Sequence, residues 1–446
     1  MIGGYPKLMG GAEQKQRRVL VLGATGLIGS AIVARLVADG WAVTAVVRKI
    51  GTGARGLPAD RLLQLDLAKT TRPGDWLLHL DGVDAVVNSA GALQDGGRDS
   101  LALVHEVGPA ALFEACERKG IRRVIHISAM GADPAAPTRF ARTKGAADQR
   151  LEASPLDWVI LRPSVIVGRA AYGGSALFRG LASLPLQLRI EGAAPLSVVQ
   201  LDDVAETVAR MLAPEAPARV SFDLPGPQPL SMEQVVANYR HWLGWKPARI
   251  VTLPGWLMTI AYRLGDLAGL LGWRAPVRST TGQELARGSV GDPERWTSLT
   301  GIIPRSLDAA LAASPASVQE RWFARLYLLK PLAFTIFAAF WIVTGILSLT
   351  VGYAEGVVQM REGGAGMLAV PGAVGGALAD LLIGFAILWR PTTRWGLWAA
   401  LALSIVYLVA GTVMMPKLWI EPLGPLMKIW PILTLNLFLL AILDER

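Results

Sequence analysis

The stretch VLGATGLIGS, residues 21–30, decides the fold of the amino-terminal part of the chain. It overlaps the short apolar run RVLVL (18–22) and leads into AIVARLVADG (31–40). The apolar run predicts a buried strand, and the spacing of apolar residues after it predicts a helix. Three glycines between a strand and a helix form the pattern of a dinucleotide-binding turn.

Each glycine of this turn has its own physical role. Gly23 permits the tight turn, Gly26 lets the backbone approach a pyrophosphate, and Gly29 allows the helix to pack closely on the strand. The start of the helix then offers N–H donors and a positive dipole to the phosphates. The alternative is a tight turn that holds no ligand. The residues expected to bind the cofactor here are Gly23, Thr25, Gly26, Leu27, Ile28 and Gly29.

Strands and helices are expected to alternate through the first two thirds of the chain. After the first strand, further strands are predicted at 42–48, 61–67, 83–91 and 122–131, and a helical pattern covers 102–120. Such alternation predicts a parallel, doubly wound sheet. We therefore predict an α/β (Rossmann) sheet with a small substrate lobe, followed by an all-α domain of four transmembrane helices.

The ends of the predicted strands indicate which nucleotide binds. Where NAD binders carry an acidic residue after the second strand, this chain has Arg48 and Lys49, which favours NADP(H) over NAD(H). The alternative is a cation that merely faces solvent. Asp66 and Leu67 end the third predicted strand and are expected beside the adenine. Ser89, Ala90 and Gly91 close the fourth, where the cofactor should cross the edge of the sheet.

These stretches together resemble the short-chain dehydrogenase/reductase superfamily, over roughly residues 17–250. GATGLIG marks the extended and atypical branches, and supporting stretches are LRPSVIVG (161–168) and VVQLDDVAETVA (198–209). The segment at 222–244 looks like one in the atypical subgroup that includes the NADPH-carrying accessory subunit of respiratory complex I. The resemblance implies a catalytic Ser, Tyr and Lys.

Two of those three catalytic residues match. Ser128 and Lys144 occupy the family positions, but Phe140 stands where the tyrosine is expected, and a phenyl ring cannot transfer a proton. The residue we favour as replacement is Tyr172, since in the family its segment approaches the nicotinamide. His126, Thr143 and a bound water are the alternatives. The predicted catalytic residues are thus Ser128, Lys144 and Tyr172.

Other chemistries find little support in the sequence. The four histidines are scattered and no metal-ligand spacing occurs, so no metal site is expected. The net charge of +9 is not clustered on one element, which argues against nucleic acid. Cys116 is the only cysteine, so no internal disulfide can form.

The last third of the chain is apolar enough to enter a membrane. Hydrophobic residues make up 52% and charged residues 18% of the 446 residues, whereas a soluble chain carries about 25% charge. Four segments are each long enough for a hydrocarbon core of ~30 Å. They are 331–350, 371–389, 395–415 and 425–443. This tail resembles the DoxX-like membrane family.

Flanking cations predict how the tail is oriented. Cations precede the first span and lie between the second and third, and this bias places the amino-terminal domain and the carboxyl terminus in the cytoplasm. They are Arg321, Arg325, Lys330, Arg390 and Arg394. We expect a multi-pass protein of the inner (plasma) membrane. Asp380 lies within a span and suggests either a functional carboxyl or a buried hydrogen bond, with Asn436 as its possible partner.

The predicted organisation has four parts. They are an N-terminal tail (1–16), the nucleotide-binding domain with its substrate lobe (17–250), an amphipathic segment and connector (251–325) and the membrane domain (326–446). Within the third part, the stretch at 250–276 carries apolar residues at helical spacing. It predicts a helix in the membrane interface or, equally, a lid over the substrate cleft.

Three functions are compatible with these features. The first is an NADPH-dependent reductase of a lipophilic small molecule such as a quinone, isoprenoid or lipid carbonyl. The second, motivated by Phe140, is a nucleotide-carrying assembly or sensing subunit of a membrane complex that does no catalysis. The third is a carrier role for the membrane domain, which would depend on Asp380. In each case the lipid bilayer is a partner.

Overall fold

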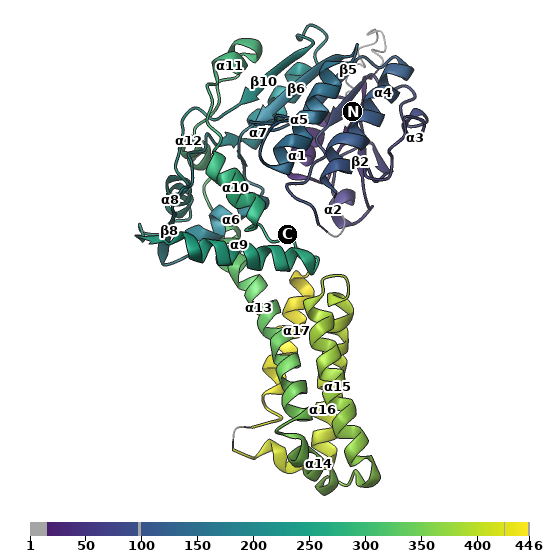
Figure 1. Ribbon diagram of the computed structural model, residues 1–446, viewed down its shortest axis with the longest axis vertical. Coiled ribbons are helices and arrows are strands. Elements are labelled where there is room, and N and C mark those ends of the chain that lie inside the picture. Colours follow the sequence, from purple (N-terminus) through teal and green to yellow (C-terminus); the bar gives the residue numbers. More distant parts are fainter. Residues whose placement is uncertain (1–15, 97–99, 423, 445–446) are drawn as a thin grey trace, which may run out of the picture. The chain divides into compact units, whose positions relative to one another are not determined.

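The protein is described by a computed structural model that covers residues 16–96, 100–422 and 424–444 (Figure 1). The predicted tail at 1–16 lies, apart from Gln16, outside the described residues. The chain forms two compact units, which are described separately. The first unit comprises 1–175, 189–242 and 280–315, and the second comprises 176–188, 243–279 and 316–446.

A seven-stranded sheet forms the centre of the first unit. Its order is β10-β6-β5-β4-β1-β2-β3, and each neighbouring pair is parallel. The strands are β1 (Arg18–Leu22), β2 (Ala42–Val47), β3 (Arg61–Gln64), β4 (Ala85–Asn88), β5 (Arg123–Ile127), β6 (Asp157–Pro163) and β10 (Val220–Leu224). Because the order reverses between β1 and β4, the sheet is doubly wound, and this confirms the predicted fold class.

Helices bury both faces of this sheet. On one face α1 (Leu27–Ala38) and α7 (Leu201–Met211) pack with Trp296 of α11 (Glu294–Thr300). On the other face α4 (Gly108–Lys119) and α5 (Arg139–Glu152) contribute to a second core. Trp296 is fully buried, so the stretch that we predicted to be a polar connector supplies a core residue to the sheet domain.

Smaller elements complete the part of the chain before the membrane helices. The short strands are β7 (Ile166–Val167), β8 (Leu186–Ile190), β9 (Val199–Gln200) and β11 (Arg249–Leu253). The remaining helices are α2 (Thr52–Arg55), α3 (Gly74–Leu77), α6 (Gly173–Ala182), α8 (Met232–Trp242), α9 (Gly255–Leu270), α10 (Ser279–Arg287) and α12 (Leu307–Ala313).

The second unit contains a bundle of apolar helices. They are α13 (Val318–Leu349), α15 (Ala369–Leu388), α16 (Thr393–Met414) and α17 (Ile429–Ile442), with the short α14 (Tyr353–Glu362) after α13. Their shared core includes Phe334, Trp341, Ile387, Leu397 and Leu439. Among the described residues, three helices are long and apolar enough to cross a membrane, namely α13, α15 (together with the turn Gly366–Leu368 before it) and α16.

The fourth apolar segment forms a shorter helix than we predicted. The sequence predicted a span at 425–443, but α17 has 14 residues, or about 21 Å at 1.5 Å per residue. The helix starts late because Pro422, Gly424 and Pro425 precede it, and these residues interrupt helical hydrogen bonding. It still packs in the bundle, since Leu439 is buried against the other helices.

The close approach of two backbone segments at the glycine turn predicts a sensitive site at Gly29. A methyl group there would lie 2.2 Å from the carbonyl oxygen of Gly23, so Gly29→Ala must push α1 away from β1. We expect the free energy of unfolding to fall by about 1–3 kcal/mol, seen as a lower midpoint of the thermal transition. The control is Gly53→Ala, where the methyl group meets nothing within 4 Å. Equal midpoints for the two variants would contradict the role given to Gly29.

Candidate nucleotide-binding and catalytic site

The turn between β1 and α1 is built to receive a phosphate. Gly23 has φ +70°, and a side chain on it would lie 2.8 Å from the backbone of Ala90. Gly26 caps α1 without any side-chain hydrogen bond. The first N–H groups of a helix have no acceptor inside the helix, so these donors point to a ligand position. The residues present therefore fit the pyrophosphate of a dinucleotide.

The end of β4 lies directly beside this turn. Leu22 and Asn88 are register partners in the sheet, and the Ser89 hydroxyl donates to the Leu22 carbonyl at 2.6 Å. The Ala90 amide donates to the Asn88 side-chain oxygen at 3.2 Å, which fixes the chain before Gly91. This edge is the switch point at which doubly wound sheets bind ligands. The structure thus brings Ser89 and Ala90 to the glycine turn.

Arg48, Asp66 and Leu67 follow two strands on the other side of the turn. Arg48 is exposed directly after β2, and β3 pairs with β2 as far as Gln64. Strand β3 is shorter than the predicted 61–67, so Asp66 and Leu67 lie in the turn after it. Asp66 accepts a hydrogen bond from the Ala68 amide at 3.2 Å, and Leu67 is buried.

Lys144 is buried next to the end of β4. Its ammonium donates to the carbonyl of Ile127 at 2.8 Å. A side chain on Gly91 would lie 3.4 Å from the Lys144 nitrogen, so the absence of one keeps the space beside the ammonium open. Burial lowers the pKa of Lys144 to about 8, because desolvation penalises the charged amine. The arrangement suits an amine that holds the cofactor.

The Ser128 hydroxyl is hydrogen-bonded to a residue that the sequence did not indicate as its partner. Its hydroxyl donates to the Asp148 carboxylate at 2.9 Å, and Arg162 donates to the same oxygen at 2.9 Å. Asp148 lies one helical turn after Lys144 on α5. Burial raises the pKa of Asp148. The single proton of Ser128 is therefore committed to this carboxylate in the structure.

A chain of hydrogen bonds surrounds Phe140. The Ala92 amide donates to Nε2 of His105 at 3.1 Å, so the neutral ring carries its proton on Nδ1. That proton meets the Thr143 hydroxyl at 2.9 Å, and Thr143 in turn donates to the carbonyl of Phe140 at 3.1 Å. Burial lowers the pKa of His105 to about 2. Neither His105 nor Thr143 has a free proton for a substrate.

His105 falls in the stretch 102–120 for which the sequence predicts a helix, and the structure shows that this helix is irregular at His105. It lies in a π-helical turn, Ala102–Val107, and its ring packs edge-on against Phe140 at 5.7 Å between centroids. Pro109, four residues later, has no N–H to donate to the His105 carbonyl, and this breaks the α-helical pattern. That spacing of proline after histidine was the available signal.

The other two candidate proton donors differ in their surroundings. His126 is buried between the Asn88 amide, 3.1 Å from Nδ1, and the Asp148 carboxylate, 3.7 Å from Nε2. Desolvation holds the pKa of His126 well below its usual value, so it stays neutral. Tyr172 precedes α6 and is partly exposed, and its backbone exchanges hydrogen bonds with the Ser175 hydroxyl. Its role stays a prediction.

Polar groups also occur inside the membrane bundle. Tyr407 donates its hydroxyl proton to the buried carboxyl of Asp380 at 3.0 Å. Asn436 instead donates to the Leu397 carbonyl at 3.1 Å. Leu397 and Tyr407 are ten residues apart on α16, or about 15 Å. The predicted pairing of Asp380 with Asn436 is therefore wrong, and Tyr407 is the partner.

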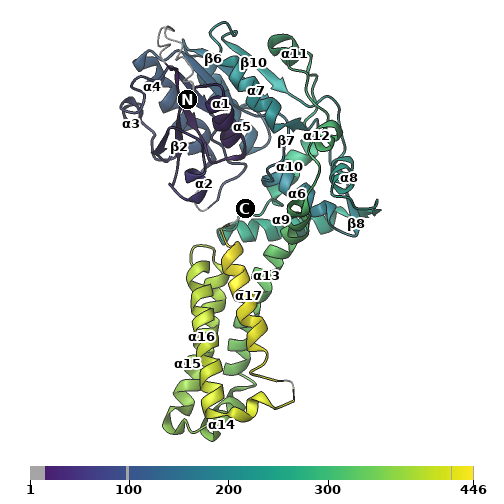
Figure 2. The same ribbon diagram turned by 180° about the vertical axis from the view of Figure 1, so that it is seen from behind.

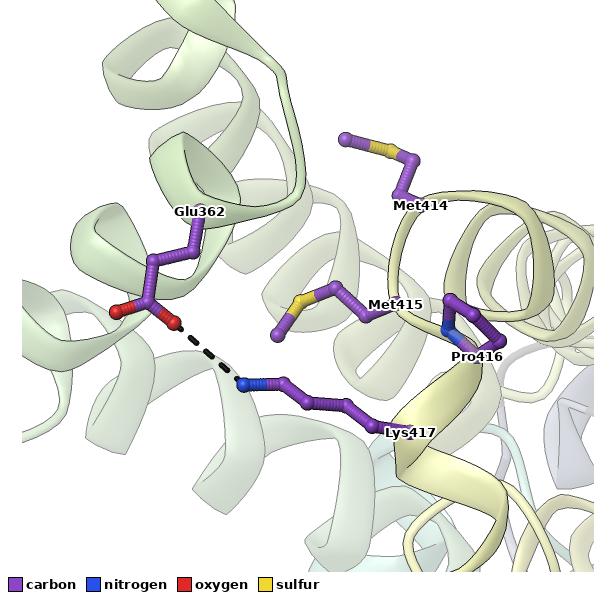
Figure 3. Close-up of a pocket in the computed structure, with 5 residues that line it drawn as sticks. All are labelled: Glu362, Met414, Met415, Pro416 and Lys417. Carbon is purple, nitrogen blue, oxygen red and sulfur yellow. Dashed lines mark ion pairs between the residues drawn. The ribbon is translucent and has the colours of Figure 1, made fainter.

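A shallow hollow at one end of the bundle carries no comparable chemistry. It is lined by Glu362, Lys417, Pro416 and two methionines (Figure 3). The Glu362 carboxylate and the Lys417 ammonium point toward each other at 3.6 Å, and both side chains are more than half exposed. Exposed pairs of this kind contribute little to stability. No cluster of three or more metal-ligating side chains occurs among the described residues.

Two known families match separate parts of the chain. Residues 23–214 match the NAD(P)H-binding family, and residues 338–437 match the DoxX-like family. The first match begins at Gly23 and includes Lys144. A 3-diazoavenalumate denitrifying reductase from a Streptomyces species is 30% identical over 62% of this chain and 93% of its own length.

The chain belongs to the NAD(P)H-binding short-chain dehydrogenase/reductase family and carries a DoxX-like domain. Sterol demethylase protein B of Methylococcus capsulatus is 28% identical to this chain. The match covers 68% of this chain and 98% of the sterol demethylase protein. Ceramide reductase of Caulobacter vibrioides is 23% identical, covering 53% of the chain and 73% of the relative.

Solved structures share the fold of this family member. UDP-glucose 4-epimerase of Thermotoga maritima superimposes with a TM-score of 0.51 at 17% identity, over 66% of this chain and 96% of the epimerase. At that identity the likeness concerns the fold alone. It agrees with the parallel sheet of the first unit.

The buried ammonium of Lys144 predicts how nucleotide affinity depends on pH. Because its pKa lies near 8, the protonated fraction in the free protein falls from about pH 7 to about pH 9. A neutral amine attracts the cofactor less, so the dissociation constant for NADPH should rise over that range. Lys144→Met should bind more weakly at about pH 7 and lose this dependence.

The control for this measurement is Lys119→Met, which removes a lysine that pairs with Asp81 at the surface. It should keep the wild-type profile, measured by calorimetric titration. An unchanged profile in Lys144→Met would contradict the placement of Lys144 against the cofactor.

Proposed function

We propose that the protein is a membrane-tethered, NADP(H)-dependent reductase of a lipophilic carbonyl or quinone-type substrate. The observation that carries the proposal is the union, in one chain, of a phosphate-binding turn with a buried lysine and a bundle of membrane-length helices. A water-soluble substrate would not need the bundle. A purely structural membrane anchor would not need the open space beside Lys144.

The preference for NADP(H) rests on Arg48. It is exposed at the end of β2, where a cation can meet the phosphate on the adenosine ribose and an acidic residue would meet the unmodified ribose. Lys49 adds a second exposed cation. No acidic residue stands at this strand end, so the electrostatics favour the more negative nucleotide.

Besides a bound water, two side chains are proposed as proton sources for a carbonyl reduction. The reduced nicotinamide supplies a hydride when it is bound. The phenyl ring of Phe140 has no acidic proton to supply. The side-chain protons of His105, Thr143 and Ser128 are already held in hydrogen bonds to neighbouring acceptors. Tyr172 is the first candidate, and the Lys144 ammonium, which also holds the ribose in this proposal, is the second.

A lipid-like substrate is supported by the membrane bundle and by the relatives. Two of them are named for sterol and ceramide chemistry, and both of these compounds partition into bilayers. We place the chain in the inner (plasma) membrane with its nucleotide domain and carboxyl terminus in the cytoplasm. Arg390 at the α15–α16 turn pairs with Asp444 at 3.2 Å, so that cationic turn and the end of α17 lie on one side.

The alternative function is a nucleotide-carrying subunit that does not turn over. The observation that favours it is Phe140 together with the hydrogen bonds in which His105 and Thr143 hold their side-chain protons. Such a subunit would retain NADP(H) tightly and act within a membrane complex. The Ser128→Ala variant would then keep its function in cells.

Turnover separates these two functions. Protein in nanodiscs should oxidise NADPH when a panel of lipophilic ketones and quinones is added, followed by the loss of nicotinamide absorbance. Lys144→Met should lower kcat/KM by about 100-fold or more, and Tyr172→Phe should do the same if Tyr172 is the proton donor. A Tyr172→Phe variant with wild-type kcat would leave Lys144 as the donor. Nucleotide that binds but is never oxidised across the panel would favour the non-catalytic function.

Replacing Arg48 tests the cofactor preference. In Arg48→Asp, we expect the affinity for NADPH to fall by about tenfold or more, because a charge-assisted contact with the phosphate is replaced by repulsion. The affinity for NADH should change little or improve. Arg55→Asp, a nearby exposed cation in α2, serves as the control. Equal losses for both nucleotides would contradict the NADP(H) preference.

A further inference from the structure

Helix α9 carries a row of large apolar side chains that its own unit leaves uncovered. The row lies within an arc of about 100° at 3.6 residues per turn. Between 38 and 65% of each of these residues is exposed. They are Trp256, Leu257, Ile260, Leu264 and Leu267. A soluble protein rarely exposes so large a contiguous apolar surface without an occupant.

The opposite face of α9 is closed by the chain itself. Gly265 and Gly269 are buried there, and a side chain on Gly265 would lie 1.7 Å from the carbonyl oxygen of Val277. Arg278 pairs with Asp266 at 3.1 Å and holds the returning segment against this face. The helix is therefore fixed on one side, and its apolar row faces away from the segment that fixes it.

The carboxyl end of α9 is bonded to the end of the membrane bundle. Trp273 donates its indole proton to the Leu388 carbonyl at 2.7 Å, and the Arg390 amide donates to the Leu271 carbonyl at 2.9 Å. The Trp273 ring also packs on Phe334 of α13. All of these residues belong to the second unit, and Figures 1 and 2 both show α9 running across the end of the bundle.

The residues around this junction are typical of a membrane–water interface. Trp389 and Trp395 are exposed on either side of the α15–α16 turn, next to the cations Arg390 and Arg394. Tryptophans and cations gather at the level of the lipid headgroups. Because α9 ends at this level and crosses the bundle, its 16 residues, about 24 Å, run along the membrane plane.

We propose that α9 lies in the cytoplasmic membrane interface with its apolar row among the upper acyl chains. Because α9 is bonded to the end of the bundle beside its exposed tryptophans and cations, we assign the uncovered row to lipid rather than to a soluble partner. Arg263 lies at the edge of the row and Arg274 follows the helix, so both can meet anionic headgroups. The bilayer would thereby hold the base of the second unit at a fixed depth.

Fluorescent labels on single cysteines test this placement in the full chain. NBD is attached to Ile260→Cys and Leu264→Cys, in the row, and to Thr259→Cys, which is exposed on the polar side. Cys116 is buried, and burial raises the pKa of its thiol to about 12, so it should stay unlabelled. The proteins are placed in vesicles of phosphatidylcholine and phosphatidylglycerol, with or without lipids that carry a nitroxide near the headgroup.

The expected result is a blue-shifted emission at 260 and 264, with severalfold stronger quenching by the nitroxide lipids than at 259. Equal quenching by aqueous iodide at all three positions would overturn the proposal, because the row would then face water. Protection from both quenchers at 260 and 264 would also overturn it, since protein would cover the row as a lid or a second copy. An unchanged NADPH-shifted thermal transition checks that each variant is folded.

Discussion

The approach of Gly29 to the carbonyl oxygen of Gly23 is the constraint on which the nucleotide site depends. No side chain fits there, since a methyl group would lie 2.2 Å from that oxygen. The contact presses the start of α1 against the end of β1 and directs its uncapped N–H groups at the switch point of the sheet. Arg48, Ser89 and Ser128 are placed relative to that edge, because each directly follows a strand of the same parallel sheet.

Phe140 separates the two tasks that this fold usually combines. Lys144 lies beside Gly91, where the proposed function has it hold the nucleotide. Around it, however, the side chains of His105, Thr143 and Ser128 donate hydrogen bonds to neighbouring acceptors. A site whose nearby hydroxyl and imidazole protons are held in internal hydrogen bonds must receive its proton from a mobile group, from solvent or from the lysine itself.

The sequence predicts the parts of this structure that short stretches determine. The glycine turn, the alternation of strands and helices and the membrane helices follow from local spacing, and Lys144 and Phe140 follow from the family pattern. Contacts between segments distant in the sequence could not be predicted from local spacing. Asp148 lies 20 residues from Ser128, and Trp296 lies 89 residues after its partner Thr207. The partner of Asp380 was misjudged for the same reason, since helix rotation decides which side chains meet.

Under the proposed function, this chain passes a hydride from NADPH to a compound dissolved in the membrane. To test this, the protein in vesicles of total bacterial lipid is supplied with NADPH deuterated at the transferred position, and the extracted lipids are searched by mass spectrometry. Deuterium should appear in a lipid, and it should fail to appear with Lys144→Met. Retention of all deuterium on bound nucleotide, with full function in cells, would contradict it.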